Sequence, residues 1–204
     1  WDITPIRVTT SPGDVTFAAV NGSAVLTVTD TGHGAVANDF VTFSGAASLG
    51  GVITAGVLNQ EYQIITVPDG DNYTISARTA STTIQSLTVD GEIVDTPVAA
   101  NSSDTGNGGG STVGSYQVNT GLTVAVAGTG WGSSTWGRDT WGSAATSTTA
   151  TELRIWTHDN FGEDLLFNVR DGNIYYWDTD TDTLGTDRGV PLTLVSGADA
   201  ATPT

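Results

Sequence analysis

Alternating carboxylates near the C-terminal end are the first residues whose spacing could do chemistry. Asp178, Asp180 and Asp182 stand at every second position, and a turn can bring aspartate oxygens together around a hard cation such as Ca²⁺. However, the sixth position of such a loop is Thr183, where a glycine is needed, and the twelfth is Gly189, where a bidentate glutamate is needed. The pattern therefore favours a solvated loop over a calcium site.

A second group of acids could supply the carboxylate pair of a glycosidase. Asp159, Glu163 and Asp164 lie within six positions of one another. Neighbouring side chains in a strand point to opposite faces, so Glu163 and Asp164 cannot both face one substrate if a strand begins there. The chain has no cysteine and no Gly-x-Ser-x-Gly elbow, and His158 is the one histidine near these acids. We therefore expect no enzyme activity.

The other histidine and the glycine-rich loops give no cofactor site. His33 lies between Gly32 and Gly34 in a predicted turn, without a second histidine or a cysteine nearby, so a loop histidine is favoured over a metal ligand. No glycine-rich stretch is followed by the lysine and helix of a phosphate-binding loop. We expect neither a metal nor a cofactor.

Three tryptophans form a short repeat in the second half of the chain. Trp131, Trp136 and Trp141 are five residues apart, and each precedes a glycine. This spacing predicts an extended, loop-like ribbon, because an odd period alternates the faces of a strand and glycine favours turns. Tryptophan is common both at protein interfaces and on sugar-binding platforms. We interpret the three indoles as interface residues, with carbohydrate stacking as the alternative.

The elements that must position these groups centre on residues 153–178, the densest run of large apolar side chains. Residues 165–169 and 174–177 are two β-type runs separated by a turn that contains Asp171-Gly172, which predicts a hairpin. Aromatic residues fall on both faces of this hairpin. Such a hairpin needs cover on both sides, as in stacked sheets or propeller blades.

Residues 159–178, together with residues 1–7 and the tryptophan-glycine run at 131–142, resemble the tail nozzle (tail tubular B type) proteins of short-tailed bacteriophages. The resemblance implies a β-propeller and a structural role in the virion, in the phage tail. It also implies a homo-oligomeric ring that contacts other tail proteins, such as an adaptor and fibres, around a DNA passage. No motif in it is catalytic. A carbohydrate-binding or adhesive, receptor-binding β module is the alternative function.

Composition agrees with an all-β protein. Threonine, serine, glycine, alanine, valine and aspartate dominate, whereas the usual helix formers are sparse. Six basic against 22 acidic residues give a formal charge of −16, which repels phosphates. We therefore expect DNA to pass without sequence-specific binding, and no apolar run is long enough for a membrane span. Methionine is absent and Trp1 begins abruptly, so we expect a piece of a longer polypeptide.

The predicted fold combines incomplete β-propeller-like blades with an inserted small β-barrel or β-sandwich domain. Residues 1–10 are expected to form a propeller-like strand, and residues 11–98 the inserted domain, built from short strands separated by turn residues. Residues 99–151 combine a flexible Gly/Ser/Thr-rich linker with the tryptophan-glycine ribbon. Residues 152–204 are expected to form a propeller-like blade.

Overall fold

The computed structural model describes residues 3–79, 88–89, 92–93, 96–120, 155–169, 172–180 and 187–195. These residues form antiparallel β-sheets with one short α-helix and one turn of 3-10 helix, so the prediction of an all-β protein is confirmed. The chain divides into two compact units, Trp1–Asn119 (unit 1) and Thr120–Thr204 (unit 2).

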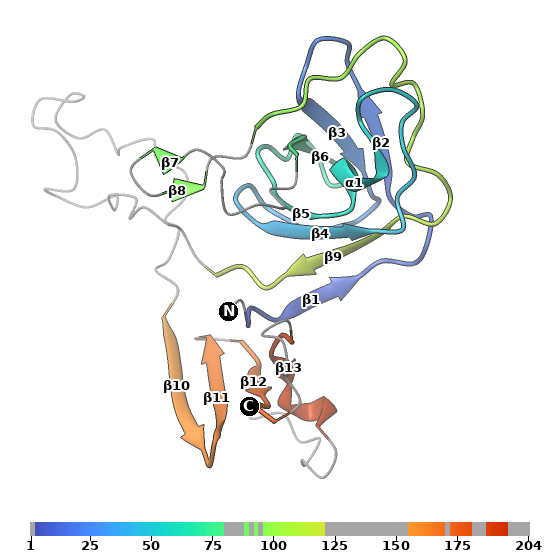
Figure 1. Ribbon diagram of the computed structural model, residues 1–204. Coiled ribbons are helices and arrows are strands. Elements are labelled where there is room, and N and C mark those ends of the chain that lie inside the picture. The colour runs from blue at the N-terminus through green and yellow to red at the C-terminus, as the bar shows by residue number, and fades with distance from the viewer. Residues whose placement is uncertain are drawn as a thin grey trace, which may run out of the picture. The chain divides into compact units, whose positions relative to one another are not determined.

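The first sheet of unit 1 joins segments from the two ends of that unit. Its order is β1-β9-β4-β5, and every pair is antiparallel (Figure 1). The strands are β1 (Ile6–Thr9), β9 (Val113–Gln117), β4 (Phe40–Ser44) and β5 (Glu61–Gln63). A register shift between Ile6 and Val8 marks a bulge in β1.

The second sheet has three strands in the order β2-β3-β6: β2 (Thr16–Ala19), β3 (Val25–Thr29) and β6 (Asn72–Ser76). Buried and exposed side chains alternate clearly in β3, where Leu26 and Val28 are buried and Thr27 is exposed. The described part of unit 1 also contains a hairpin of β7 (Thr88–Val89) and β8 (Glu92–Ile93) and the helix α1 (Ala55–Leu58). Thr54 caps α1 by accepting a hydrogen bond from the Val57 amide.

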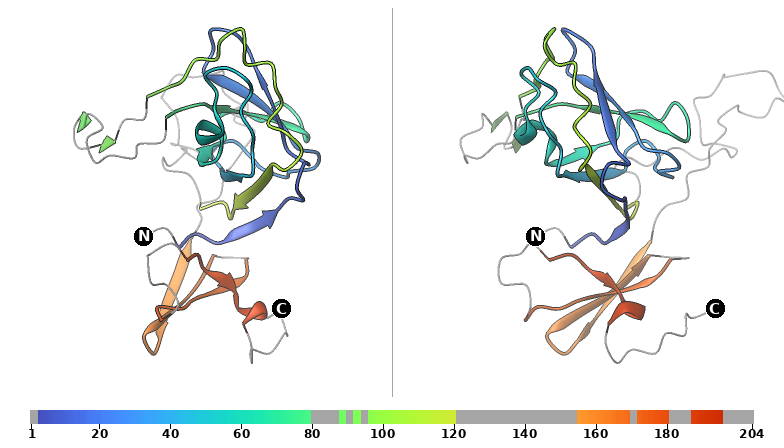
Figure 2. Two further views of the ribbon diagram at one scale, coloured as in Figure 1. Left: turned by 45° about the vertical axis from the view of Figure 1, so that its right-hand side comes forward. Right: turned by 90° about the vertical axis from the view of Figure 1, so that its right-hand side faces the viewer.

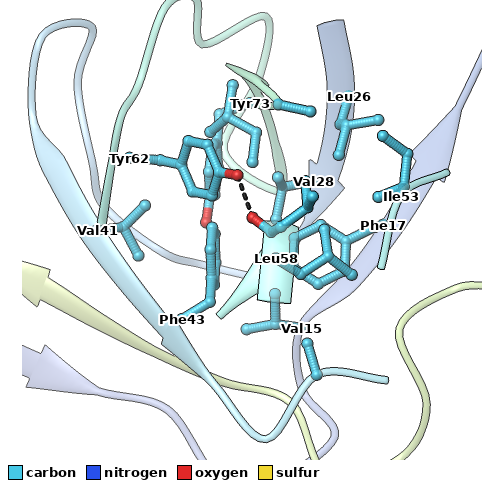
Figure 3. Close-up of a cluster of buried hydrophobic side chains, with 14 of the residues drawn as sticks. Val15, Phe17, Leu26, Val28, Val41, Phe43, Ile53, Leu58, Tyr62 and Tyr73 are labelled. Atoms are coloured by element: carbon cyan, nitrogen blue, oxygen red, sulfur yellow. Dashed lines mark hydrogen bonds between the residues drawn. The ribbon is translucent and has the colours of Figure 1, made fainter. Parts of the chain in front are cut away.

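The two sheets of unit 1 enclose one hydrophobic core (Figure 3). Phe17 of the second sheet packs edge-on against Phe43 of the first, with ring centroids 5.0 Å apart. Each fully buried aliphatic or aromatic side chain contributes roughly 2 kcal/mol to folding. The fully buried large side chains are Tyr62, Tyr73, Tyr116, Phe43, Leu26, Leu49, Ile53, Leu58, Ile64, Ile75, Val15 and Val28. Neither sheet closes into a barrel.

The segment predicted as a flexible linker is instead part of this unit. Asp104 and Thr112 are buried, and residues 113–117 form β9, which lies between β1 and β4 in the first sheet. Residues 99–111 contain no apolar side chain larger than alanine, but their backbone is held by hydrogen bonds. Phe17 donates its amide to the Asn107 carbonyl at 3.0 Å, and Ala47 donates to the Gly108 carbonyl at 2.7 Å. Hydrogen bonds to its backbone, more than buried apolar side chains, therefore hold this segment in the folded unit.

The first strand likewise belongs to unit 1, whereas the sequence suggested a separate strand over residues 1–10. β1 pairs with β9, and beyond that pair the Val118 amide donates to the Pro5 carbonyl at 2.8 Å. The Asn119 side-chain amide then donates to the Asp39 carboxylate at 2.6 Å. Unit 1 therefore has its entry and its exit side by side.

Unit 2 contains one four-stranded antiparallel sheet whose strands follow chain order, β10-β11-β12-β13 (Figure 1). The strands are β10 (Trp156–Phe161), β11 (Asp164–Val169), β12 (Ile174–Trp177) and β13 (Val190–Pro191), followed by the 3-10 turn η1 (Leu192–Leu194). The sheet is visibly twisted, orange to red in Figure 2.

The predicted hairpin is confirmed, because β11 and β12 pair from Leu165 opposite Trp177 to Asn168 opposite Ile174. A second hairpin, between β10 and β11, was not predicted. Its two-residue turn begins with Gly162 at φ +72, as a type II′ turn requires.

Candidate functional site

Aromatic rings on one face of the unit 2 sheet form its most conspicuous side-chain cluster. Phe167 and Tyr175 lie opposite each other on β11 and β12, with ring centroids 5.6 Å apart, and Trp156 of β10 follows at 6.1 Å from Phe167. We call these three residues the aromatic row. Phe167 and Tyr175 are buried, and Ile174 and Tyr176 on the opposite face are half-buried. One face is thus covered far better than the other.

The indole N–H groups of unit 2 are tied to the backbone of neighbouring segments. Trp156 donates from Nε1 to the Thr120 carbonyl at 3.1 Å, and Trp177 donates from Nε1 to the Asp187 carbonyl at 3.1 Å. Each indole therefore fixes the segment that leads into β10 or follows β12. Both indoles therefore have a packing role, and the N–H group of each is already engaged in a hydrogen bond.

Asp164 is fully engaged by hydrogen-bond donors. Oδ2 accepts from the Tyr176 hydroxyl at 2.5 Å, and Oδ1 accepts from the Thr179 amide at 3.0 Å and from the Thr179 hydroxyl at 3.2 Å. These bonds, the Tyr176 bond foremost, hold the pKa of Asp164 below its usual value. The same bond raises the pKa of Tyr176 to about 12. A carboxylate with these hydrogen bonds stabilises the local turn. Glu163 lies in the turn before it.

The predicted calcium candidates do not converge in the described part of the chain. The Asp180 amide donates to Asp178 Oδ1 at 2.9 Å, which is a local Asx-type turn. Asp182 lies outside the described residues. Among the residues that are described, no three histidine, aspartate or glutamate side chains are grouped so as to hold a metal ion.

The three predicted interface tryptophans, Trp131, Trp136 and Trp141, also lie outside the described residues. Their role at an interface therefore stays a prediction.

No helix among the described residues has the length and apolar character needed to cross a bilayer.

His33 sits in the predicted turn but is buried, which its glycine neighbours did not indicate. Its Nδ1 accepts a hydrogen bond from the Ala35 amide at 3.0 Å, and its ring packs edge-on against Tyr73 at 4.9 Å between centroids. Nδ1 is therefore engaged by the turn itself, and Nε2 is buried with no hydrogen-bond partner among the described residues. His33 shapes the turn that leads toward β4.

A buried hydroxyl and carboxylate chain lies beside His33. The Tyr116 hydroxyl donates to Asp30 Oδ2 at 2.5 Å and lies 2.8 Å from the Tyr73 hydroxyl. Burial is the main cause that raises the pKa of both tyrosines above the usual value. The Arg7 guanidinium lies 5.8 Å from the centre of the Tyr116 ring and donates to the His33 carbonyl at 3.0 Å. The chain links β9, β6 and the loop after β3.

Asp104 accepts four hydrogen bonds in unit 1, and sequence reasoning missed it. Its carboxylate accepts backbone amides from Gly51, Val52, Ile53 and Asn101 at 2.8–3.2 Å. Burial pushes the pKa of Asp104 upward, but the four amides outweigh it and hold the pKa below its usual value. The Asn-x-x-Asp spacing was the one available signal, because such acids commonly fasten loops.

Comparisons with known proteins give a weak structural likeness. No protein-family model matches this chain, and no curated protein sequence matches it. Among solved structures, the chain is similar to one described as "Phage phi92 endosialidase", with 13% sequence identity and a TM-score of 0.33. The likeness covers 98% of this chain and 26% of that chain, so this chain spans about a quarter of that protein's length. A TM-score of this size establishes neither a shared fold nor a shared activity.

Proposed function

We propose that this chain is a structural part of a bacteriophage tail, within the nozzle through which DNA is ejected, and that it turns over no substrate. The strand order of unit 2 is the observation that carries the proposal. Four antiparallel strands in chain order are the topology of a single propeller blade. The same residues, 159–178, carry the sequence resemblance to tail nozzle proteins.

A single blade is incomplete by itself. Propellers stack four to eight four-stranded blades face to face around an axis. The aromatic row fills one face of the unit 2 sheet, and the opposite face carries half-buried Leu166, Ile174 and Tyr176. The face of the aromatic row is already largely buried, so the half-buried opposite face is the one that would gain most stability from a neighbouring blade.

Unit 1 has the connections of an inserted domain. Its entry at Pro5 and its exit at Val118 are joined by a backbone hydrogen bond of 2.8 Å. A domain whose ends are adjacent can interrupt another fold without disturbing it. This supports the view that unit 1 is inserted between parts of a propeller, with bounds nearer to residues 6 and 118 than to 11 and 98.

The charge suits a passage for DNA. A formal charge of −16 disfavours ion pairing with phosphates, so a DNA strand would slide past this surface without being held. In the proposed ring, Trp131, Trp136 and Trp141 insert into a neighbouring subunit or into an adjoining tail protein. A buried indole at such a contact is typically worth more than 2 kcal/mol.

The test is where the chain lies in the particle and what the tryptophans do. A short epitope inserted at the exposed Asn21-Gly22 turn should appear by electron microscopy near the tail axis. Replacing the three tryptophans by alanine should block assembly. Labelling at a fibre tip, or normal assembly of the triple variant, would refute the proposal and favour the adhesive alternative. In that case neutral sugars should quench tryptophan fluorescence saturably.

A further inference from the structure

Within the described part of the chain, the outer strand of the unit 2 sheet has an open edge. Among the described strands only β11 pairs with β10, and this pairing is unbroken from Trp156 opposite Val169 to Phe161 opposite Asp164 (Figure 1). Natural sheets protect long edges with charged side chains, lysine above all, and with proline, bulges or covering segments. β10 has six residues, contains no proline or lysine, and shows no bulge; its one carboxylate is Asp159, and its residues 157–161 are exposed.

The turn determines which backbone groups on this edge are free. Phe161 is the last residue before the two-residue turn, so its N–H and C=O face β11. Antiparallel pairing alternates along the strand, so the backbone groups of Trp156, His158 and Asn160 point away from β11. Trp156 and His158 can thus exchange hydrogen bonds with an added strand. The Asn160 amide donates to the exposed Asp159 Oδ1 at 2.8 Å, so an added strand would have to replace this local bond.

Exposed apolar side chains mark the two ends of the same edge. Ile155 is 45% exposed and Phe161 is 66% exposed. They lie six positions apart, and side chains at odd-numbered positions share one face of the strand. An antiparallel copy of β10 centred on His158 would place Ile155 of each chain opposite Phe161 of the other.

We propose that a second copy of this chain adds to the sheet through β10, antiparallel and with a two-fold axis at His158. This register alone sets all three outward-facing residues opposite one another, and it sets Asp159 opposite Thr157. Asn160 then exchanges its amide bond with Asp159 for one with Trp156 of the second copy. Centring on Asp159 would place two carboxylates opposite each other, which destabilises a strand pair. Centring on Thr157 would leave Asn160 without a partner in β10.

This contact goes beyond the proposed function and depends on β10 alone. A two-fold contact joins the same surface of both copies, whereas a ring needs two different surfaces. A failure of the edge contact would therefore leave the ring proposal intact, and a failure of the ring proposal would leave the edge contact intact.

Single cysteines test the register, because the 204-residue chain has none of its own. In the proposed pair, the two copies of residue 158 lie about 5.5 Å apart between Cα atoms. That separation is within disulfide range. His158→Cys should therefore form a reducible covalent dimer under mild oxidation. In the matched controls Thr157→Cys and Asp159→Cys, the two copies of the new cysteine are two positions out of register, too far apart to bridge.

The expected result is at least tenfold more covalent dimer for His158→Cys than for either control. Equal crosslinking at all three positions, or no crosslinking at position 158, would overturn the proposal. Sedimentation equilibrium of the cysteine-free chain gives a second measurement. Phe161→Ala should raise the dimer Kd roughly tenfold, because it removes both contacts with Ile155. Leu194→Ala, another exposed apolar residue, should leave Kd unchanged. A monomeric chain at every concentration would assign the edge to a different partner and refute the proposal.

Discussion

Replacing Asp104 by asparagine should weaken unit 1 more than its loop position suggests. The carboxylate receives the amides of Gly51 and Ile53 on Oδ1, and those of Val52 and Asn101 on Oδ2. A hydrogen bond to a charged group contributes about 1.5–3 kcal/mol, and a buried donor left without a partner costs about 1–3 kcal/mol. An asparagine keeps one acceptor oxygen and turns an NH₂ group toward two donors. We expect the free energy of unfolding to fall by about 3 kcal/mol.

The effect of Asp104 should depend on pH in a defined direction. Its pKa is lowered in the folded protein, so the folded state binds fewer protons than the unfolded state, whose aspartates titrate near about 3.9. The stabilisation is therefore complete above about pH 4 and is lost as pH falls through the folded pKa. The stability difference between the wild type and Asp104→Asn should be constant at neutral pH and should shrink toward pH 3.

Urea unfolding followed by far-ultraviolet circular dichroism measures this difference. Tryptophan fluorescence is an internal control, because five of the six tryptophans follow Asn119 and report on unit 2. Asp69→Asn is the matched variant. Asp69 also accepts a backbone amide, from Asp71, and its pKa is also lowered, but it is fully exposed, so its loss should be smaller. A loss below about 0.5 kcal/mol for Asp104→Asn, or a difference independent of pH, would refute the reasoning.

Two further predictions concern a close backbone approach and a coupled tyrosine. Gly45→Ala should lower the free energy of unfolding by about 3 kcal/mol in urea, because an added Cβ at φ +71 would collide with the Ser111 carbonyl. Gly22→Ala, at φ +82 with open space around it, should cost only about 1 kcal/mol, and equal losses would contradict the collision. Asp164→Asn should bring the pKa of Tyr176 down from about 12 toward 10 in an ultraviolet titration of phenolate. An unchanged titration curve would show that the hydrogen bond does not control the hydroxyl.

The sequence predicted the elements whose signals are local. The hairpin of β11 and β12 was recognised from its Asp-Gly turn and flanking aromatic residues. Strand alternation and turn chemistry act over a few residues, so they are readable in a single chain. The hairpin at Gly162 carried the same kind of signal, glycine at the first turn position, and could have been found.

Long-range pairing was not readable in this way. β9 pairs with β1 more than 100 positions earlier in the chain, and the local sequence of residues 113–117 does not indicate which strand it pairs with. Residues 99–111 were interpreted as a linker because composition measures apolar burial, whereas this segment is held by backbone hydrogen bonds and by Asp104. For the aromatic row, the sequence predicted only that both faces of the hairpin need to be covered. The candidate interface tryptophans lie outside the described residues.

The side-by-side ends of unit 1 also determine how this unit would respond to mechanical load. Tension applied through Pro5 and Val118 acts at the same end of the antiparallel pair of β1 and β9, across its hydrogen bonds. Those bonds would open one after another, as a zipper does, whereas strands pulled along their length must break many bonds together. In unit 1, β1 should therefore detach from β9 at low force while the core around Phe43 and Tyr62 stays packed. Extension of the chain would begin at the pairing of β1 with β9.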